Sequence, residues 1–247
     1  MNDFPDGLVA MRKELDTAEV MRLIERCAKW VDMATFEYLP VWHPELARND
    51  ELYKANWSER RMNRNSRTGV EEHKREGNTA ANVTLTHAWG LRSKERPNWS
   101  CCHIWGVDDE TNQESNVVVQ DKRFYTCISN MVLLPTPLKA FTDAMPEVKM
   151  MLRVCAYHNY GWLCQHKAVK KSALDVKNWK NWDVYPESWP RPGRENAQPK
   201  GTIEFSNKIK KSADRRITKI RKELESAGNN YPKKEVREVL RFWNQTI

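Results

Sequence analysis

The segment from Trp179 to Pro199 limits how the rest of the chain can fold, because it combines three tryptophans with four prolines. Proline has no N–H to donate and a fixed φ, so neither a helix nor a central strand tolerates this density of proline. We therefore expect an extended connection whose tryptophans pack on the main body. This connection, residues 166–204, separates a larger N-terminal part from a C-terminal part that spans residues 205–247.

The C-terminal part is predicted to be helical. Apolar residues recur there at helical spacing on one face of a helix from about residue 206 to 225, which ends before Gly228. They are Ile209, Ala213, Ile217, Ile220 and Leu224. The other faces of this helix carry lysine and arginine. Pro232 then starts a last helix with an apolar face that includes Val236 and Leu240.

Within the larger part, an N-terminal region, residues 1–98, is expected to be helical and basic. Asp16 followed by Glu19 is typical of a capping box, and the apolar spacing that follows predicts an amphipathic helix over about residues 17–36. A polar, arginine-rich stretch at residues 60–81 comes next. We expect it to lie on the surface and to be helical in parts.

Residues 99–165 have a different pattern of apolar and polar residues. A short apolar run at residues 101–105 and β-branched and aromatic residues at 117–119 and 124–128 predict two strands joined by a long polar loop. Pro137 then precedes a helical pattern. Pro146 opens a longer helix that Gly161 ends.

Charge is distributed unevenly along the chain, which has a formal net charge of +8. From residue 191 onward there are 15 Lys and Arg against 7 Asp and Glu, whereas the preceding residues hold 26 of each kind. A basic helix attracts polyanions through counterion release, which makes nucleic acid the leading class of partner. A solvated basic helix face explains the same pattern, and charge does not decide between them.

The remaining composition favours a cytoplasmic globular protein. No apolar run has the roughly 18 residues of a membrane span, and the first residues do not resemble an export signal. The six cysteines form no C-x-x-C pair, so a structural zinc site is not indicated. They are expected to be reduced and mostly buried.

Two short motifs lie within residues 99–165. The first is Cys102-His103-Ile104-Trp105, and the second is the run Asn130-Met131-Val132-Leu133-Leu134-Pro135. Together they resemble the HNH (ββα-metal) endonucleases, in particular divergent members of the bacterial restriction-endonuclease kind. The resemblance covers about residues 100–165. It implies a strand with the histidine, a loop, a second strand, and a short helix that begins at the asparagine.

The resemblance also implies catalytic roles. His103 would be the general base that takes a proton from water, and Asn130 would orient that histidine or brace the loop. A divalent cation, Mg²⁺ or Mn²⁺, would stabilise the leaving oxygen. The family's metal-ligand position before the histidine is occupied here by Cys102, a thiol that is a poor ligand for Mg²⁺. A further ligand position of the family is occupied here by Lys139, which cannot bind a cation while it is protonated. Asp143, one turn later on the same helix face, is therefore the expected substitute ligand.

Three outcomes are open for the metal. Asp143, Asn130 and a backbone carbonyl could hold it, Cys102 could favour Mn²⁺ or Zn²⁺, or the domain has lost catalysis and retains DNA binding. Basic side chains are expected to contact phosphates on double-stranded DNA. They are Arg60, Arg61, Arg64, Arg67, Arg123, Lys139, Arg215 and Arg216. Asn63 and Asn65, next to Arg64, have the chemistry to read base edges.

The sequence therefore predicts an α+β protein with an HNH-like ββα-metal core at residues 99–165, flanked by N- and C-terminal helices. The expected function is metal-dependent cleavage of double-stranded DNA, as a restriction or defence enzyme, in a possible homodimer that matches a symmetric site. Two alternatives stay open. One is a DNA-binding module that does not cut, and the other is an RNA-directed nuclease whose 11 tryptophans stack unpaired bases.

Overall fold

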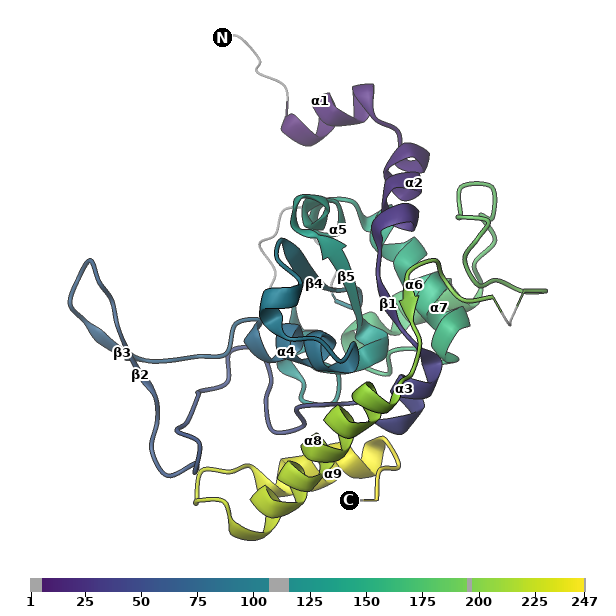
Figure 1. Ribbon diagram of the computed structural model, residues 1–247. Coiled ribbons are helices and arrows are strands. Elements are labelled where there is room, and N and C mark those ends of the chain that lie inside the picture. The colour runs from purple at the N-terminus through teal and green to yellow at the C-terminus, as the bar shows by residue number, and fades with distance from the viewer. Residues whose placement is uncertain (1–5, 107–115, 195–196, 247) are drawn as a thin grey trace. The chain divides into compact units, whose positions relative to one another are not determined.

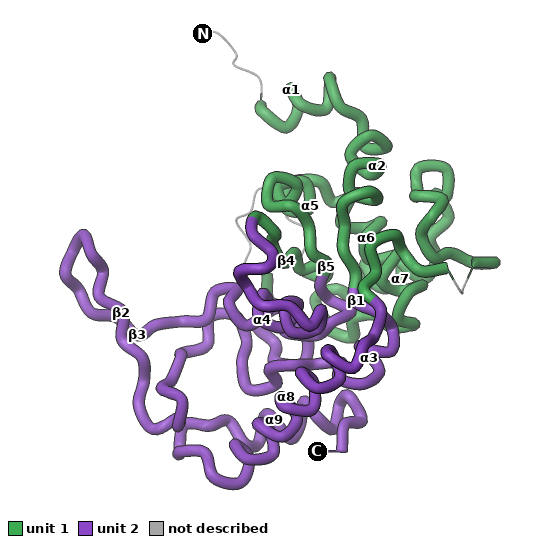
Figure 2. Tube along the Cα trace, in the orientation of Figure 1, with its two compact units in different colours: residues 1–30, 98–116, 132–203 green, residues 31–97, 117–131, 204–247 purple. Residues whose placement is uncertain are grey.

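The computed structural model of the chain describes residues 6–106, 116–194 and 197–246 (Figure 1). Helices and strands are mixed, which confirms the predicted α+β class. The chain forms two compact units, and each unit is assembled from three separate stretches of sequence (Figure 2). Unit 1 comprises residues 1–30, 98–116 and 132–203, and unit 2 comprises residues 31–97, 117–131 and 204–247. Among the described helices, none has the length and apolar character needed to cross a bilayer.

Unit 1 combines helices with short paired strands. Its elements are α1 (Gly7–Glu14), α2 (Thr17–Cys27), β4 (Trp99–His103), a 3₁₀ turn (Thr136–Leu138), α5 (Lys139–Ala144), α6 (Pro146–Tyr160), a second 3₁₀ turn (Lys167–Val169), α7 (Lys170–Lys177) and β6 (Thr202–Ile203). The chain passes between the units at β1 (Trp30–Val31) and β5 (Met131–Pro135). Strand β4 pairs with β5, and β6 pairs with β1.

The helix expected over residues 17–36 is wrong in its extent. The capping box is present, because Glu19 N donates to the Asp16 carboxylate and Asp16 N donates to Glu19. The helix nevertheless ends at Cys27, since the next residues are drawn into backbone pairing. Lys29 exchanges hydrogen bonds of 2.9 and 3.1 Å with Leu133, a long-range pairing that local spacing does not show.

The second predicted strand is also misplaced. Residues 117–120 form a 3₁₀ turn, residues 124–126 lie in turns, and Cys127 forms only an isolated bridge with Val41, so no strand is formed over 117–128. The strand that pairs with β4 is instead β5, at residues 131–135. Asn130 therefore precedes a strand and does not stand at the entry to a helix. The helix predicted after Pro137 is present as α5, and α6 ends at Gly161, whose φ is +61°.

The described residues of the proline- and tryptophan-rich connection form no helix or strand between 178 and 201, as the sequence predicts for Trp179 to Pro199. Its expected bounds, 166–204, are too wide, because α7 and β6 lie within them. It packs on unit 1 through aromatic contacts. Trp189 is fully buried and makes an edge-to-face contact with Trp30, with ring centroids 5.8 Å apart. The Tyr185 hydroxyl donates to the Pro190 carbonyl oxygen over 2.8 Å. These contacts confirm that aromatic residues fix this segment.

Unit 2 is built largely from helices. It contains α3 (Met33–Tyr38), β2 (Met62–Arg64), β3 (Glu71–His73), α4 (Thr79–Ala88), α8 (Asn207–Ser226), α9 (Lys233–Phe242) and 3₁₀ turns at Ser93–Glu95, Val117–Gln120 and Ile128–Asn130. Helices α8 and α9 confirm the two helices predicted for the C-terminal part. An apolar cluster joins them to the loop before β2; its buried members are Trp57, Ile220, Tyr231, Val236 and Leu240.

The arginine-rich stretch is a β-hairpin, not a helix. Strands β2 and β3 pair in antiparallel register, with Met62 opposite His73 and Arg64 opposite Glu71. Asn65 forms the turn, because its side-chain oxygen accepts from the backbone N–H groups of Arg67 and Thr68. Gly69 follows in the left-handed region at φ +71°. The expectation of a surface position is confirmed for residues 60–75 and is wrong for Glu76, Ala80 and Ala81, which are buried. Of residues 60–81, only 79–81 are helical, at the start of α4.

Candidate functional site

His103 is the last residue of β4, and the backbone that follows it is held by a buried arginine. Arg153 on α6 is fully buried; its Nε donates to the Ile104 carbonyl oxygen over 2.7 Å and its Nη2 donates to the Gly106 carbonyl oxygen over 3.0 Å. Its guanidinium carbon lies 5.3 Å from the centre of the Trp105 ring. Three consecutive residues after His103 are thus tied to one helix. His103 itself is half-buried.

Cys102, the residue before His103, does not have the properties of a metal ligand. Burial raises the pKa of its thiol to about 11, and a hydrogen bond with Thr142 on α5 only partly opposes that effect. The thiol is therefore protonated near neutral pH, whereas metal binding needs the thiolate. Its Sγ donates weakly to the Ser100 carbonyl oxygen at 3.8 Å.

Asp143 and Lys139 lie on one face of α5 and form an ion pair with each other. Both side chains are about half exposed, at 46% and 42%. Asp143, which is predicted to bind a cation, is thus paired with Lys139, which is predicted to contact DNA. No group of three or more His, Cys, Asp or Glu side chains suited to a metal occurs among the described residues. Cys102 and Asp143 do not fit the divalent ion that the resemblance implies.

Asn130 braces a loop in unit 2. It is fully buried, and its Nδ2 donates to the Phe124 carbonyl oxygen over 2.9 Å, which closes the turn that leads to β5. A side-chain amide that satisfies a buried carbonyl fixes the local backbone. This geometry fits the bracing role, one of the two roles that the resemblance implies for Asn130.

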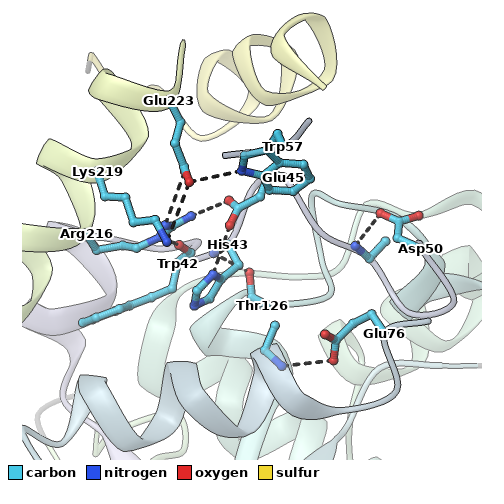
Figure 3. A network of polar contacts seen from close by, with 12 residues as sticks. Trp42, His43, Glu45, Asp50, Trp57, Glu76, Thr126, Arg216, Lys219 and Glu223 are labelled. Atoms are coloured by element: carbon cyan, nitrogen blue, oxygen red, sulfur yellow. Dashed lines mark hydrogen bonds and ion pairs between the residues drawn. The ribbon is translucent and has the colours of Figure 1, made fainter. Parts of the chain in front are cut away.

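Arg216 does not fit the prediction that it contacts DNA. It is buried, with 6% of its side chain exposed, and it forms an ion pair with Glu45 (Figure 3). Its Nε donates to the Trp42 carbonyl oxygen, and its Nη1 lies 3.8 Å from the Glu223 carboxylate. The buried face of α8 includes Arg216, between Ala213 and Ile220, and Glu223, one turn after Ile220. It is therefore turned relative to the purely apolar stripe that the sequence indicates.

The carboxylates around Arg216 complete a buried polar network within unit 2 (Figure 3). Burial disfavours a charged Glu45, but Arg216 and His43 outweigh it and lower the pKa of Glu45 to about 2. His43 Nδ1 lies 3.2 Å from Glu45, while burial and the Arg216 charge lower the pKa of His43. Trp57 Nε1 donates to Glu223 over 3.2 Å. The network joins α8 to two loops and is structural.

The other predicted DNA contacts divide into two groups. Arg123 forms a two-point ion pair with Asp121, with Nε 3.0 Å from Oδ1, and it also lies over the rings of Phe124 and Phe242. This guanidinium is already engaged. Arg60 pairs with Glu51 over 2.8 Å at the base of the hairpin. Arg61, Arg64, Arg67 and Arg215 are exposed.

Sequence reasoning missed Arg153 and Glu76. Arg153 interrupts the apolar run Met151–Cys155 of α6, and a charge in such a run is the signal that could have identified it. Glu76 is 3% exposed and accepts hydrogen bonds from the Tyr125 hydroxyl and from the first N–H groups of α4. Comparisons of the chain with protein-family models, curated proteins and solved structures found no match.

Proposed function

We propose that this protein binds double-stranded DNA and hydrolyses its phosphodiester bonds, as a restriction or defence enzyme does. The observation that carries the proposal is the order of elements around His103. The histidine ends β4, β4 pairs with β5 and packs against α5, and β5 leads through a short turn into α5. A ββα order with a histidine at the end of the first strand supports the resemblance to HNH endonucleases.

In this proposal His103 acts as the general base. Its imidazole accepts a proton from water, the water oxygen attacks phosphorus, and the bond from phosphorus to one sugar oxygen breaks. Arg153 is a positioning residue, because it holds the backbone directly after His103 through Ile104 and Gly106. A base must lie within hydrogen-bond reach of the attacking water, so a fixed backbone here favours catalysis.

A divalent ion is part of the proposed activity, but it has no assigned ligands. The thiol of Cys102 is protonated and Asp143 is paired with Lys139, so neither residue is retained as a ligand. This misfit favours a second candidate function. A protein that keeps the ββα order and binds duplex DNA without cutting it needs no metal at these positions.

Cleavage assays separate the candidates. Purified protein would be incubated with plasmid DNA, single-stranded DNA and RNA, each in EDTA, in Mg²⁺ and in Mn²⁺. The proposal predicts metal-dependent cutting of duplex DNA by the wild type and by His166→Ala, a histidine control in unit 1, and no cutting by His103→Ala. Duplex DNA that stays intact in every metal while gel-shift binding persists would support the non-cutting protein. Preferred cutting of RNA would support an RNA-directed nuclease.

A further inference from the structure

The β2–β3 hairpin makes almost no contribution to the core of unit 2. Every residue from 58 to 75 is exposed, and Figure 2 shows this hairpin extending from the rest of its unit. Two apolar side chains, Met62 and Val70, are about half exposed. A segment that buries so little gains little free energy from folding, so its ordered geometry depends on its base and on what it contacts.

The base of the hairpin is held firmly. Backbone hydrogen bonds continue the ladder beyond β2 and β3, where Lys74 N donates to Arg61 and Leu52 N donates to Lys74, each over 2.8 Å. The buried carboxylate of Glu76 then joins the end of the hairpin to α4 and to Tyr125. The turn is closed by the Asn65 side chain. The β2–β3 hairpin therefore has a defined conformation and a fixed base.

The first strand and the turn of the hairpin are basic. Residues 61–70 contain Arg61 at the base and Arg64 and Arg67 toward the tip, and no acidic residue. Among the residues that the structure describes, no carboxylate forms an ion pair with any of these three arginines. Glu71, the first carboxylate of the second strand, lies opposite Arg64 in the register but forms no ion pair with it among the described contacts. The tip of the hairpin thus presents the exposed guanidinium groups of Arg64 and Arg67, which favour a polyanionic partner.

The dimensions of the ribbon suit the major groove of B-DNA. Two strands lie about 4.8 Å apart, and the four steps from Arg61 to Asn65 span about 13 Å at roughly 3.3 Å per residue. The groove is about 12 Å wide and about 8.5 Å deep, and it admits a two-stranded β-ribbon. The A-form groove of duplex RNA is too narrow for side chains to read. Shape and charge together favour duplex DNA.

We propose that the β2–β3 hairpin enters the major groove of double-stranded DNA and that Arg64 and Arg67 contact the DNA there. This inference rests on the proposed function, because it names the element that binds the DNA substrate. Side chains alternate along a strand, so Asn63 faces away from Arg64 and contacts the opposite wall of the groove. Asn65 serves the turn, so its replacement would disturb the hairpin itself.

The test compares the arginine pair with a matched pair of exposed basic residues. Arg64→Ala/Arg67→Ala and the control Lys234→Ala/Arg237→Ala, on α9, remove the same charge. Binding of fluorescein-labelled 24-base-pair DNA would be followed by anisotropy between 50 and 300 mM salt. We expect the hairpin variant to bind more than tenfold more weakly, with a salt slope smaller by about 2 for two lost phosphate contacts. The control should change affinity less than threefold.

Two further substrates test the groove. DNA whose cytosines carry bulky glucosylated 5-hydroxymethyl groups fills the major groove, so it should bind the wild type at least tenfold more weakly and show no added loss in the hairpin variant. Duplex RNA of the same sequence should bind weakly to both proteins. Unchanged melting temperatures would exclude misfolding as the cause of any loss.

The inference is overturned if the wild type binds duplex DNA and the hairpin variant binds it with the same affinity and salt slope. It is also overturned if duplex RNA binding falls as strongly as DNA binding, because the partner is then RNA. If the hairpin variant binds DNA more weakly but the wild type cleaves no DNA, the result supports the inference and contradicts only the proposed nuclease activity. A wild type that binds no duplex DNA contradicts both proposals.

Discussion

Arg153 donates a hydrogen bond over 2.7 Å to the carbonyl oxygen of Ile104, the residue that directly follows His103. The same guanidinium reaches Gly106 and lies against Trp105, so one fully buried side chain fixes three consecutive residues. A planar guanidinium donates in several fixed directions, and lysine cannot reproduce this pattern. The relationship links the packing of α6 to the position of the proposed general base.

Replacement of Arg153 should therefore destabilise unit 1. Arg153→Met leaves the Ile104 and Gly106 carbonyls without this donor, and we expect a loss of about 2–4 kcal/mol in the free energy of unfolding, measured with urea. Arg12→Met is the control, because Arg12 forms only an exposed ion pair with Glu147 and should cost less than about 1 kcal/mol. Equal stability of the two variants would contradict the structural role of Arg153.

The positioning role has a separate readout. Arg153→Lys keeps the charge but not the two-point geometry, so under the proposed function it should lower kcat for DNA cleavage more than it raises KM. Folded protein would be quantified by circular dichroism at the assay temperature. A variant that folds and cleaves like the wild type would show that the backbone after His103 does not need this arginine.

Cys102 should behave as a buried, protonated thiol. With a pKa of about 11 it should resist alkylation by iodoacetamide at pH 8 in the folded protein, and peptide mass spectrometry would locate the modified cysteines. Cys102→Ala should retain the metal dependence of any cleavage. Rapid alkylation of Cys102, or a large shift in the Mg²⁺ or Mn²⁺ concentration needed by the alanine variant, would restore it as a candidate ligand.

Replacement of the two neighbouring arginines on α8, Arg215 and Arg216, should have very different effects on the free energy of unfolding. Arg216→Met leaves the buried Glu45 carboxylate without its main partner, and breaking a buried pair costs about 3–5 kcal/mol. Arg215→Met, at an exposed position, should change the free energy of unfolding by less than about 0.5 kcal/mol. Urea unfolding of both variants measures the contrast. Similar effects of the two substitutions would contradict the burial of Arg216.

The network around Arg216 also predicts acid sensitivity. The pKa of Glu45 is about 2 in the folded protein, below its ordinary value of 4.5, so its stabilisation is present above pH 4.5 and is lost as the pH falls toward 2. His43 has a lowered pKa, so the unfolded chain takes up its proton first, and stability also falls as the pH drops below about 6.5.

Midpoints of urea unfolding measured between pH 7 and pH 3 would test whether stability falls with decreasing pH. Stability should decline steadily, and Glu45→Gln should flatten the part of the curve below pH 4.5. Glu59→Gln, which removes an exposed carboxylate, should leave the shape unchanged. A midpoint that stays constant or rises on acidification would contradict the prediction.

Elements with strong local signals could be predicted from the sequence. The Asp16 capping box, the proline starts at Pro137 and Pro146 and the stop at Gly161 all act within a few residues, and the structure has them. Elements that depend on distant partners could not. The helix after Thr17 stops because Lys29 pairs with Leu133, and β5 exists because β4 lies beside it.

The candidate site divides in the same way. His103 can be identified from a short motif, but the protonation of Cys102 and the exposure of the basic side chains depend on packing. Cys102 is protonated because it is buried, and Arg216 is unsuited to DNA because Glu45 and Glu223 surround it. A list of basic residues cannot separate Arg215, which is exposed, from Arg216, which is not. The hairpin was missed because an exposed polar ribbon has no apolar alternation to reveal it.

The most direct test of the account is the rate of plasmid cleavage by wild-type protein and by His103→Ala in the same Mg²⁺ or Mn²⁺ buffer, with DNA binding measured in parallel by gel shift. The account predicts metal-dependent fragments from the wild type and at least a hundredfold slower cleavage by His103→Ala with unchanged binding. Equal cleavage by both proteins, or no cleavage by the wild type in either metal, would contradict a nuclease centred on His103.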